Sequence, residues 1–131
     1  MQVKLSHLIF YVDDILGSLA FYKKVFNIET KFIHESELYA ELSTGEVTLA
    51  FASNILGKDN LPQGYISNSL KTLPQASEIV FTVKDVALVY EKALQEGAVD
   101  VMQPAEKPWG QTVAYVRDLN GILIEIASEM A

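Results

Sequence analysis

His7, Glu78 and Glu125 are the residues whose types and positions are best suited to chemistry. His7 and Glu78 each begin a segment of alternating apolar and aromatic residues, and Glu125 lies between Ile124 and Ile126, which a strand would point to its other face. An imidazole and two carboxylates can transfer protons or form hydrogen-bonded ion pairs. We therefore expect the three side chains to project from the mixed faces of their strands toward a common point.

The elements that would position these residues occur twice along the chain. Residues 7–14 and 78–85 superpose without a gap, and each segment is a predicted strand that ends in an aspartate. After each aspartate the apolar period changes from two to about 3.6 residues, which indicates a helix that Asp14 or Asp85 can cap. Each helix is followed by three further short strands, expected at 28–34, 37–43 and 46–52 and again at 98–103, 111–117 and 122–127.

We therefore predict two βαβββ units, about 4–52 and 77–128, that together form a single domain over residues 1–131. The linker between them, about 53–76, is rich in Asn, Gly, Pro, Ser and Gln and shows no clear period. The predicted fold class is α+β. Since one helix can cover only one face of a sheet, we expect the helices on the outer faces of two curved mixed sheets. Related by pseudo-twofold symmetry, these sheets would enclose a central cleft suited to a small molecule.

Composition excludes several classes of function. The 131 residues carry a net charge of −7 and no cysteine. We therefore expect neither nucleic-acid binding through phosphate neutralisation nor a disulfide, thiolate-zinc or cysteine-nucleophile site. No apolar run approaches the ~18 residues of a membrane span. The start of the sequence lacks the basic and small-residue features of a signal peptide, and we expect a cytoplasmic protein with no nucleic-acid or membrane partner.

Several motifs resemble those of the vicinal oxygen chelate superfamily, which contains glyoxalase I, extradiol dioxygenases, fosfomycin-resistance enzymes and bleomycin-resistance proteins. They are the paired units, the opening His-Leu-Ile-Phe-Tyr-Val-Asp-Asp (7–14), the following Leu-Ala-Phe-Tyr (19–22) and the closing Val-Arg-Asp-Leu-Asn-Gly-Ile-Leu-Ile-Glu-Ile (116–126). The resemblance covers nearly the whole chain and implies the fold better than it implies the reaction. It also implies a homodimer that binds a small-molecule substrate or ligand.

The resemblance further implies a divalent-metal site in the cleft, with ligands from the first and last strands of each unit. His7 and Glu125 match two of the family's ligand positions. Glu78 stands where most metal-dependent members have histidine, and Ala50 where glyoxalase I has glutamate. A set of His7, Glu78 and Glu125 favours Mn²⁺, Mg²⁺ or Fe²⁺, with Ni²⁺ and Zn²⁺ as further candidates. The alternative is no metal at all, with Glu78 paired to His7 in a polar cavity.

Four residues are predicted to contact the small molecule: Trp109, Gln111, Tyr115 and Tyr11. Trp109 is the single tryptophan, and it lies in a predicted loop. There its ring could form a wall of an aromatic pocket or, equally, anchor the loop on the core. Gln111 and Tyr115 have the same parity in their predicted strand, and Tyr11 shares the mixed face of His7.

Three functions remain open. The first is a metal-dependent lyase, isomerase or dioxygenase in which the metal binds substrate oxygens and Glu78 or Glu125 acts as base. The second is a metal-free protein that sequesters its ligand, as bleomycin-resistance proteins do. The third is a metal-free enzyme with Glu78 as its base. Glyoxalase I itself is not expected, because its octahedral site depends on the carboxylate that Ala50 replaces.

Overall fold

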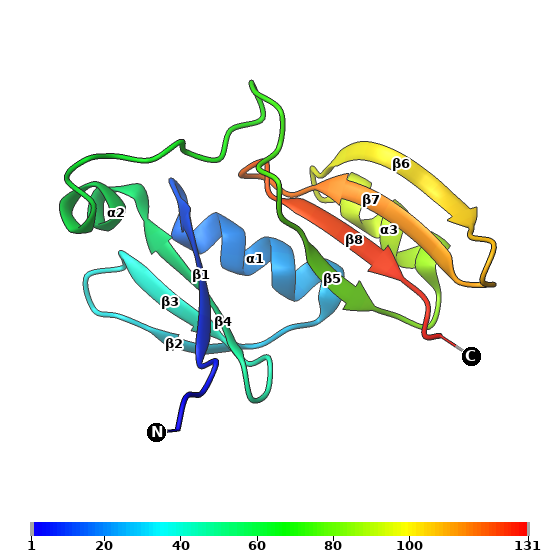
Figure 1. Ribbon diagram of the computed structural model, residues 1–131, viewed down its shortest axis with the longest axis horizontal. Coiled ribbons are helices and arrows are strands. Elements are labelled where there is room, and N and C mark those ends of the chain that lie inside the picture. Colours follow the sequence, from blue (N-terminus) through cyan, green and yellow to red (C-terminus); the bar gives the residue numbers. More distant parts are fainter. Residues whose placement is uncertain (1, 131) are drawn as a thin grey trace. The chain divides into compact units, whose positions relative to one another are not determined.

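The computed structural model describes residues 2–130, and the chain divides into two compact units, Met1–Ser67 and Asn68–Ala131 (Figure 1). Unit 1 contains, in chain order, β1 (His7–Val12), α1 (Ile15–Phe26), β2 (Thr30–Ile33), β3 (Tyr39–Leu42), β4 (Thr48–Ser53) and α2 (Asn54–Asn60). Unit 2 contains β5 (Ile79–Thr82), α3 (Val86–Gln95), β6 (Val99–Glu106), β7 (Thr112–Arg117) and β8 (Leu123–Ala127).

Both units have the predicted βαβββ order and the same sheet topology. The strands are arranged β1-β4-β3-β2 in unit 1 and β5-β8-β7-β6 in unit 2. The first and last strands of each unit pair in parallel, and the remaining pairs are antiparallel. The predicted α+β class with mixed sheets is therefore confirmed.

The register of β1 and β4 separates a polar from an apolar face in unit 1. Ile9 pairs with Ala50, and His7, two residues earlier, points to the same face because side chains alternate along a strand. The opposite face carries Phe51, which is fully buried. Its ring packs against Tyr22 of α1, with the centroids 5.2 Å apart. Helix α1 thus covers the apolar face, where it contacts β4 and β3.

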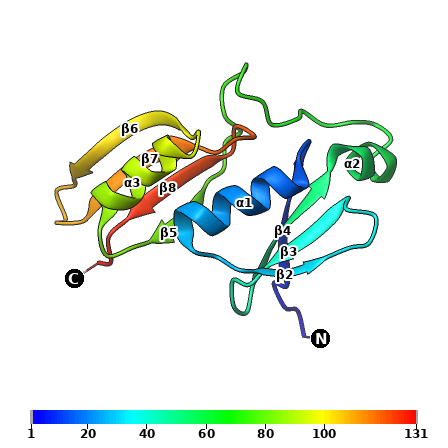
Figure 2. The same ribbon diagram turned by 180° about the vertical axis from the view of Figure 1, so that it is seen from behind.

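Unit 2 is divided in the same way. Glu125 of β8 pairs with Val80 of β5 and with Tyr115 of β7, so these three side chains share one face. Ile124 and Ile126 point to the other face and are fully buried. Helix α3 packs on that face against β6, β7 and β8, and Figure 2 shows it in front of this sheet. Each polar face therefore lies opposite its helix, as predicted.

The predicted aspartate caps begin the two longer helices. The Asp14 carboxylate accepts the Gly17 N–H at 2.9 Å, and the Asp85 carboxylate accepts the Leu88 N–H at 3.1 Å. Each bond satisfies one backbone donor that has no partner inside its helix. No helix within residues 2–130 has both the length and the apolarity that crossing a membrane requires.

The segment expected as a linker, about 53–76, contains a short helix, because Asn54–Asn60 form α2. Ser53 ends β4 and caps this helix, because its Oγ accepts the Ile55 N–H at 3.1 Å. Beyond the helix, Tyr65 stacks on Tyr11 with ring centroids 5.1 Å apart and donates to Asn54 Oδ1 at 2.6 Å. Seven residues are too few to show a helical period in the sequence.

A buried arginine ties the chain before β5 to the turn before β8. Arg117 donates to three backbone carbonyls, those of Gly121 at 3.0 Å and of Ser69 and Thr72 at 2.8 Å. Gly121 has a φ of 93°, and a Cβ at this position would lie 2.8 Å from the carbonyl carbon of Ser69. The chain is therefore fixed on unit 2 shortly before it reaches Glu78.

Candidate functional site

Two carboxyl groups meet on the polar face of unit 2. Glu125 lies on β8 and pairs with Val80 of β5, and Glu78 immediately precedes β5. The carboxyl group of Glu78 lies beside that of Glu125 and interacts with it. The Tyr115 hydroxyl of β7 donates to Glu125 Oε1 at 2.8 Å. Glu125 is therefore held between a phenol and a second carboxyl group.

This contact changes the ionisation of its members. The pKa of Glu78 is raised, first because its carboxyl group bonds to Glu125, then because of burial and the negative charge of Glu125. The hydrogen bond to Glu125 is also the main reason that the pKa of Tyr115 is raised to about 12, with burial and the two carboxylates adding to it. Two ionised carboxylates in contact repel each other, so the pair favours a shared proton or a bound cation.

A second polar cluster lies in unit 1. His7 Nε2 is 3.0 Å from Glu41 Oε2, and the Tyr39 hydroxyl donates to the same oxygen at 2.7 Å. His7 Nδ1 lies 2.9 Å from the Ser6 hydroxyl. The pKa of Glu41 is lowered, first by the hydrogen bond from Tyr39 and then by His7 and Lys31, with burial acting in the opposite direction. Glu41 is thus an ionised acceptor for two side chains.

The two polar faces each hold a carboxylate bound by a tyrosine, but on different strands. In unit 2 the carboxylate is Glu125 of β8. The corresponding register position on β4 of unit 1 is Ala50, and Glu41 lies directly opposite it on β3. The pKa of Tyr39, like that of Tyr115, is raised to about 12, here by burial first and then by Glu41. Compared with Glu125 in unit 2, Glu41 in unit 1 therefore lies one strand further from the first strand of its sheet.

The three predicted ligands are divided between the units, His7 in unit 1 and Glu78 and Glu125 in unit 2. The structure brings Glu78 and Glu125 together, and their convergence with His7 stays a prediction. Within either unit, residues 2–130 contain no group of three His, Cys, Asp or Glu side chains placed to hold one metal ion. Glu41 was not predicted, although its parity with Tyr39 in the expected strand 37–43 was a usable signal.

The residues predicted to bind a ligand are ordered by neighbouring side chains. Trp109 is 61% exposed, so its ring is not an anchor in the core. Its Nε1 donates to Gln111 Oε1 at 2.9 Å, and Gln111 Nε2 donates to the Ser128 carbonyl at 2.8 Å. Tyr115 is bound to Glu125, and Tyr11 is stacked on Tyr65 as described above. Binding of a ligand by these four residues stays a prediction.

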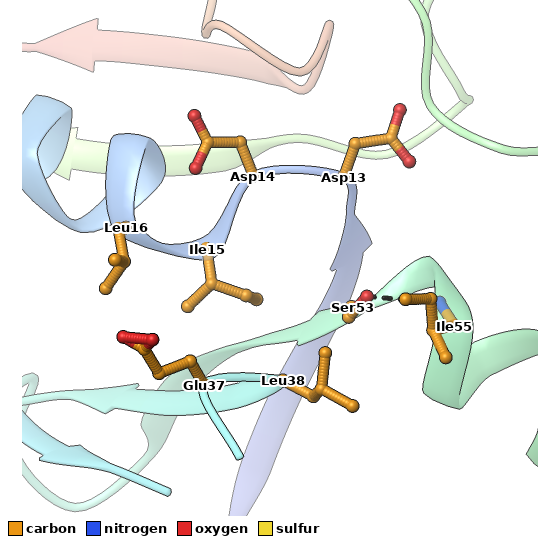
Figure 3. A pocket seen from close by; sticks show the side chains of 8 residues that line it. All are labelled: Asp13, Asp14, Ile15, Leu16, Glu37, Leu38, Ser53 and Ile55. Atoms are coloured by element: carbon orange, nitrogen blue, oxygen red, sulfur yellow. Dashed lines mark hydrogen bonds between the residues drawn. The ribbon is translucent and has the colours of Figure 1, made fainter. Parts of the chain in front are cut away.

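A cavity of about 240 Å³ lies elsewhere in unit 1, where β1 leads into α1 (Figure 3). The eight residues that line it include none of the predicted site residues. Asp14 in its wall caps α1, and Asp13 accepts a hydrogen bond from Asn54 Nδ2 at 2.7 Å. The cavity is smaller than the ~300 Å³ at which ligand sites usually begin. Its polar groups stabilise the ends of helices, and we do not assign it as the site.

A four-stranded mixed sheet with one covering helix and one polar face defines a βαβββ unit, and this chain contains two of them. The protein therefore belongs to the structural class built from two βαβββ units. A family model described as Glyoxalase/Bleomycin resistance protein/Dioxygenase superfamily matches residues 4–126. The chain belongs to this superfamily, as the sequence motifs indicated.

Solved structures show the same fold at low sequence identity. A glyoxalase-related enzyme from Fulvimarina pelagi has a TM-score of 0.81 at 19% identity, covering 98% of this chain and 88% of that chain. A glyoxalase/bleomycin resistance protein/dioxygenase family enzyme from Burkholderia phytofirmans PsJN has a TM-score of 0.79 at 22% identity, covering 96% and 98%. TioX from Micromonospora sp. ML1 has a TM-score of 0.69 at 20% identity, with the same coverage of 96% and 98%. No curated protein matches the sequence.

Proposed function

We propose that the protein binds a small organic molecule against its polar sheet faces and acts on it with a divalent cation held by Glu78 and Glu125. The hydrogen bond that holds the Glu125 carboxylate on the polar face of unit 2, near enough to Glu78 to raise the pKa of Glu78, is the observation that carries the proposal. A cation bound between them removes their repulsion, and both carboxylates then serve as its ligands. Membership of the superfamily supports a lyase, isomerase or oxygenase activity.

The chemistry of the donors fits a hard divalent cation. Carboxylate oxygens are the ligands preferred by Mn²⁺, Mg²⁺ and Fe²⁺, and the sequence offers no thiolate that would select softer metals. Ni²⁺ and Zn²⁺ are the further candidates. His7 is the third ligand in the proposal. A cation bound here would polarise a carbonyl or hydroxyl oxygen of the substrate.

The protein side chains supply the remaining chemistry. Tyr115 holds the Glu125 carboxylate in one orientation through its hydrogen bond. When no cation is bound, Glu78 is the group suited to moving a proton, because the neighbouring Glu125 and burial raise its pKa. Trp109 offers an exposed ring on which a planar substrate can stack.

Metal analysis of protein purified without a histidine tag, followed by calorimetric titration with Mn²⁺, tests the proposal. Glu78→Gln and Glu125→Gln should each weaken Mn²⁺ binding by at least ~10-fold. Glu78→His should retain Ni²⁺ binding, since imidazole suits that metal. Glu106→Gln, at an exposed position of the same unit, is the matched control and should bind as the wild type does. Absence of Mn²⁺, Fe²⁺ and Ni²⁺ binding would contradict the proposal.

The second candidate is a metal-free protein that sequesters its ligand. The exposed Trp109 ring, held by its bond to Gln111, favours this function because a fixed aromatic surface binds planar molecules without any catalytic group. Calorimetry with a panel of planar aromatic and glycopeptide compounds in metal-free buffer separates the two candidates. Binding that Trp109→Ala abolishes, and that Glu78→Gln leaves unchanged, would establish sequestration.

We also propose a homodimer, by likeness to the family. Light scattering of the purified protein measures its mass in solution directly. A monomer mass over the whole concentration range would contradict this part of the proposal.

A further inference from the structure

Each sheet has one outer strand that is protected against further pairing and one that is not. The outer strands are β1 and β2 in unit 1 and β5 and β6 in unit 2, and within residues 2–130 β1 pairs only with β4 and β5 only with β8. We propose that the open edges of β1 and β5, the sides that bond to no strand, bind a second copy of this chain, with β1 of one copy paired to β5 of the other. This inference rests on the homodimer of the proposed function and gives it a surface.

The outer strands β2 and β6 carry features that block pairing at a sheet edge. Natural sheets use β-bulges, prolines and charged side chains, lysine above all, for this purpose. In β2, Lys31 lies at a break in the register with β3. In β6 the register with β7 breaks twice, and Pro104 lies at the second break. A regular ladder with a further strand is therefore disfavoured at both of these edges.

The outer strands β1 and β5 are built differently. Neither strand contains a proline, a lysine, an arginine or a carboxylate. The register of β1 with β4 is unbroken over His7–Val12, and that of β5 with β8 over Ile79–Thr82. Both strands expose apolar side chains, with Ile9 46% and Val80 52% exposed. A strand paired to either edge would cover part of this apolar surface.

The backbone groups at these two edges are directed outward. The Thr48 N–H donates to the Ser6 carbonyl at 2.8 Å, so the even-numbered residues of β1 bond to β4. By alternation, the N–H and C=O of Ile9 point away from β4. The Val83 N–H donates to the last carbonyl of β8 at 2.8 Å, and the same alternation directs the N–H and C=O of Val80 away from β8. Each edge thus offers donors and acceptors to a further strand.

Charge favours the pairing of β1 with β5 over the pairing of identical edges. Glu78 immediately precedes β5 and lies beside Glu125. Two β5 edges in contact would bring a second pair of carboxyl groups toward the first, and like charges opposite each other destabilise a sheet. The β1 edge instead carries His7 and Ile9, an imidazole and an apolar side chain. In a dimer with twofold symmetry, this contact forms twice and uses both open edges of each copy.

Matched lysine variants, studied by light scattering over a range of concentrations, test the surface. Ile9→Lys and Val80→Lys place a charge on the open edges. Ile33→Lys and Val101→Lys place the same charge on β2 and β6, and their side chains are exposed to a similar degree, 41% and 48%. Each open-edge variant should raise the dimer dissociation constant by at least ~10-fold, because apolar burial is lost at both contacts. The variants on β2 and β6 should dimerise as the wild type does.

A double variant tests which edges meet. Ile9→Lys combined with Val80→Glu sets opposite charges against each other where β1 meets β5, and like charges where identical edges meet. We expect the double variant to dimerise more tightly than Ile9→Lys alone. A dimer weaker than that of Ile9→Lys would overturn the pairing of β1 with β5. Far-UV circular dichroism verifies that each variant is folded.

The outcomes separate this inference from the proposed function. If the open-edge variants weaken the dimer no more than their controls do, the surface is overturned while the homodimer is retained. A monomer at every concentration would overturn both, and the calorimetric Mn²⁺ titration would still decide the cation. Amide hydrogen exchange of the wild type needs no variant. The amides of Ile9 and Val80 should be protected in the dimer, and fast exchange at both would overturn the surface.

Discussion

Replacing Arg117 by lysine should release the chain segment that leads to Glu78. The guanidinium donates to the carbonyls of Gly121, Ser69 and Thr72, and its side chain is 8% exposed. A lysine ammonium keeps the positive charge, but it cannot reach three carbonyls in the fork geometry of arginine. At most one of the three bonds should survive in the variant.

The expected loss can be worked from these bonds. A hydrogen bond to a charged group contributes about 1.5–3 kcal/mol, so losing two of them sets an upper range of about 3–6 kcal/mol. Thr72 is exposed and Ser69 is partly exposed, so water replaces part of what is lost. We therefore expect Arg117→Lys to lower the free energy of unfolding of unit 2 by about 2–3 kcal/mol. Urea unfolding followed by far-UV circular dichroism measures this change.

Trypsin offers a local test, because Lys71 lies between the two anchored carbonyls. A local opening made easier by about 2 kcal/mol should speed cleavage after Lys71 by about 30-fold. Cleavage after Lys58, in α2 of unit 1, is the internal control and should keep its rate. An unchanged rate at Lys71, or an equal acceleration at both sites, would refute the role assigned to Arg117.

Three further predictions concern unit 2. Gly121→Ala should destabilise the protein by about 2–4 kcal/mol in urea unfolding, because φ is 93° and the new Cβ would meet the backbone of Ser69 at 2.8 Å; a loss below ~1 kcal/mol would contradict this. In metal-free buffer the raised pKa of Glu78 makes the folded state bind more protons than the unfolded chain. The free energy of unfolding should therefore fall as the pH rises from the ordinary pKa of glutamate through the raised pKa of Glu78. Glu78→Gln should remove that fall and be the more stable protein at pH 7, and an unchanged pH profile of the thermal midpoint would count against the contact with Glu125. Tyr115→Phe should lower the unfolding free energy by about 1 kcal/mol through the lost bond to Glu125, and a thermal midpoint equal to that of the wild type would disprove it.

The repeated units could be predicted because their signals are local and periodic. A strand of alternating residues followed by a helical stripe occurs twice, and Asp14 and Asp85 mark the junctions with a side chain suited to capping. Helix α2 gave no comparable signal. Its start depends on Ser53, and its place depends on the contact between Tyr65 and Tyr11, which are far apart in the sequence.

The candidate site was predictable only in part. The parity of Glu125 between two isoleucines placed it on the polar face, and its contact with Tyr115 follows from the pairing of β7 with β8. Glu41 was missed because its neighbours depend on the register between β3 and β4. A shift of one residue in that register would turn Glu41 away from His7, and the sequence alone does not specify it.

The exposed tryptophan has a practical consequence for optical measurements. An indole that water already surrounds in the native state emits much as it does in an unfolded chain, and Trp109 is 61% exposed. Its emission wavelength is therefore a poor indicator of unfolding. A planar molecule that stacks on the ring would remove that water and shift or quench the emission. Since the chain has one tryptophan, its fluorescence is an intrinsic reporter of ligands arriving at the Trp109–Gln111 loop, in a protein whose folding is better followed by circular dichroism.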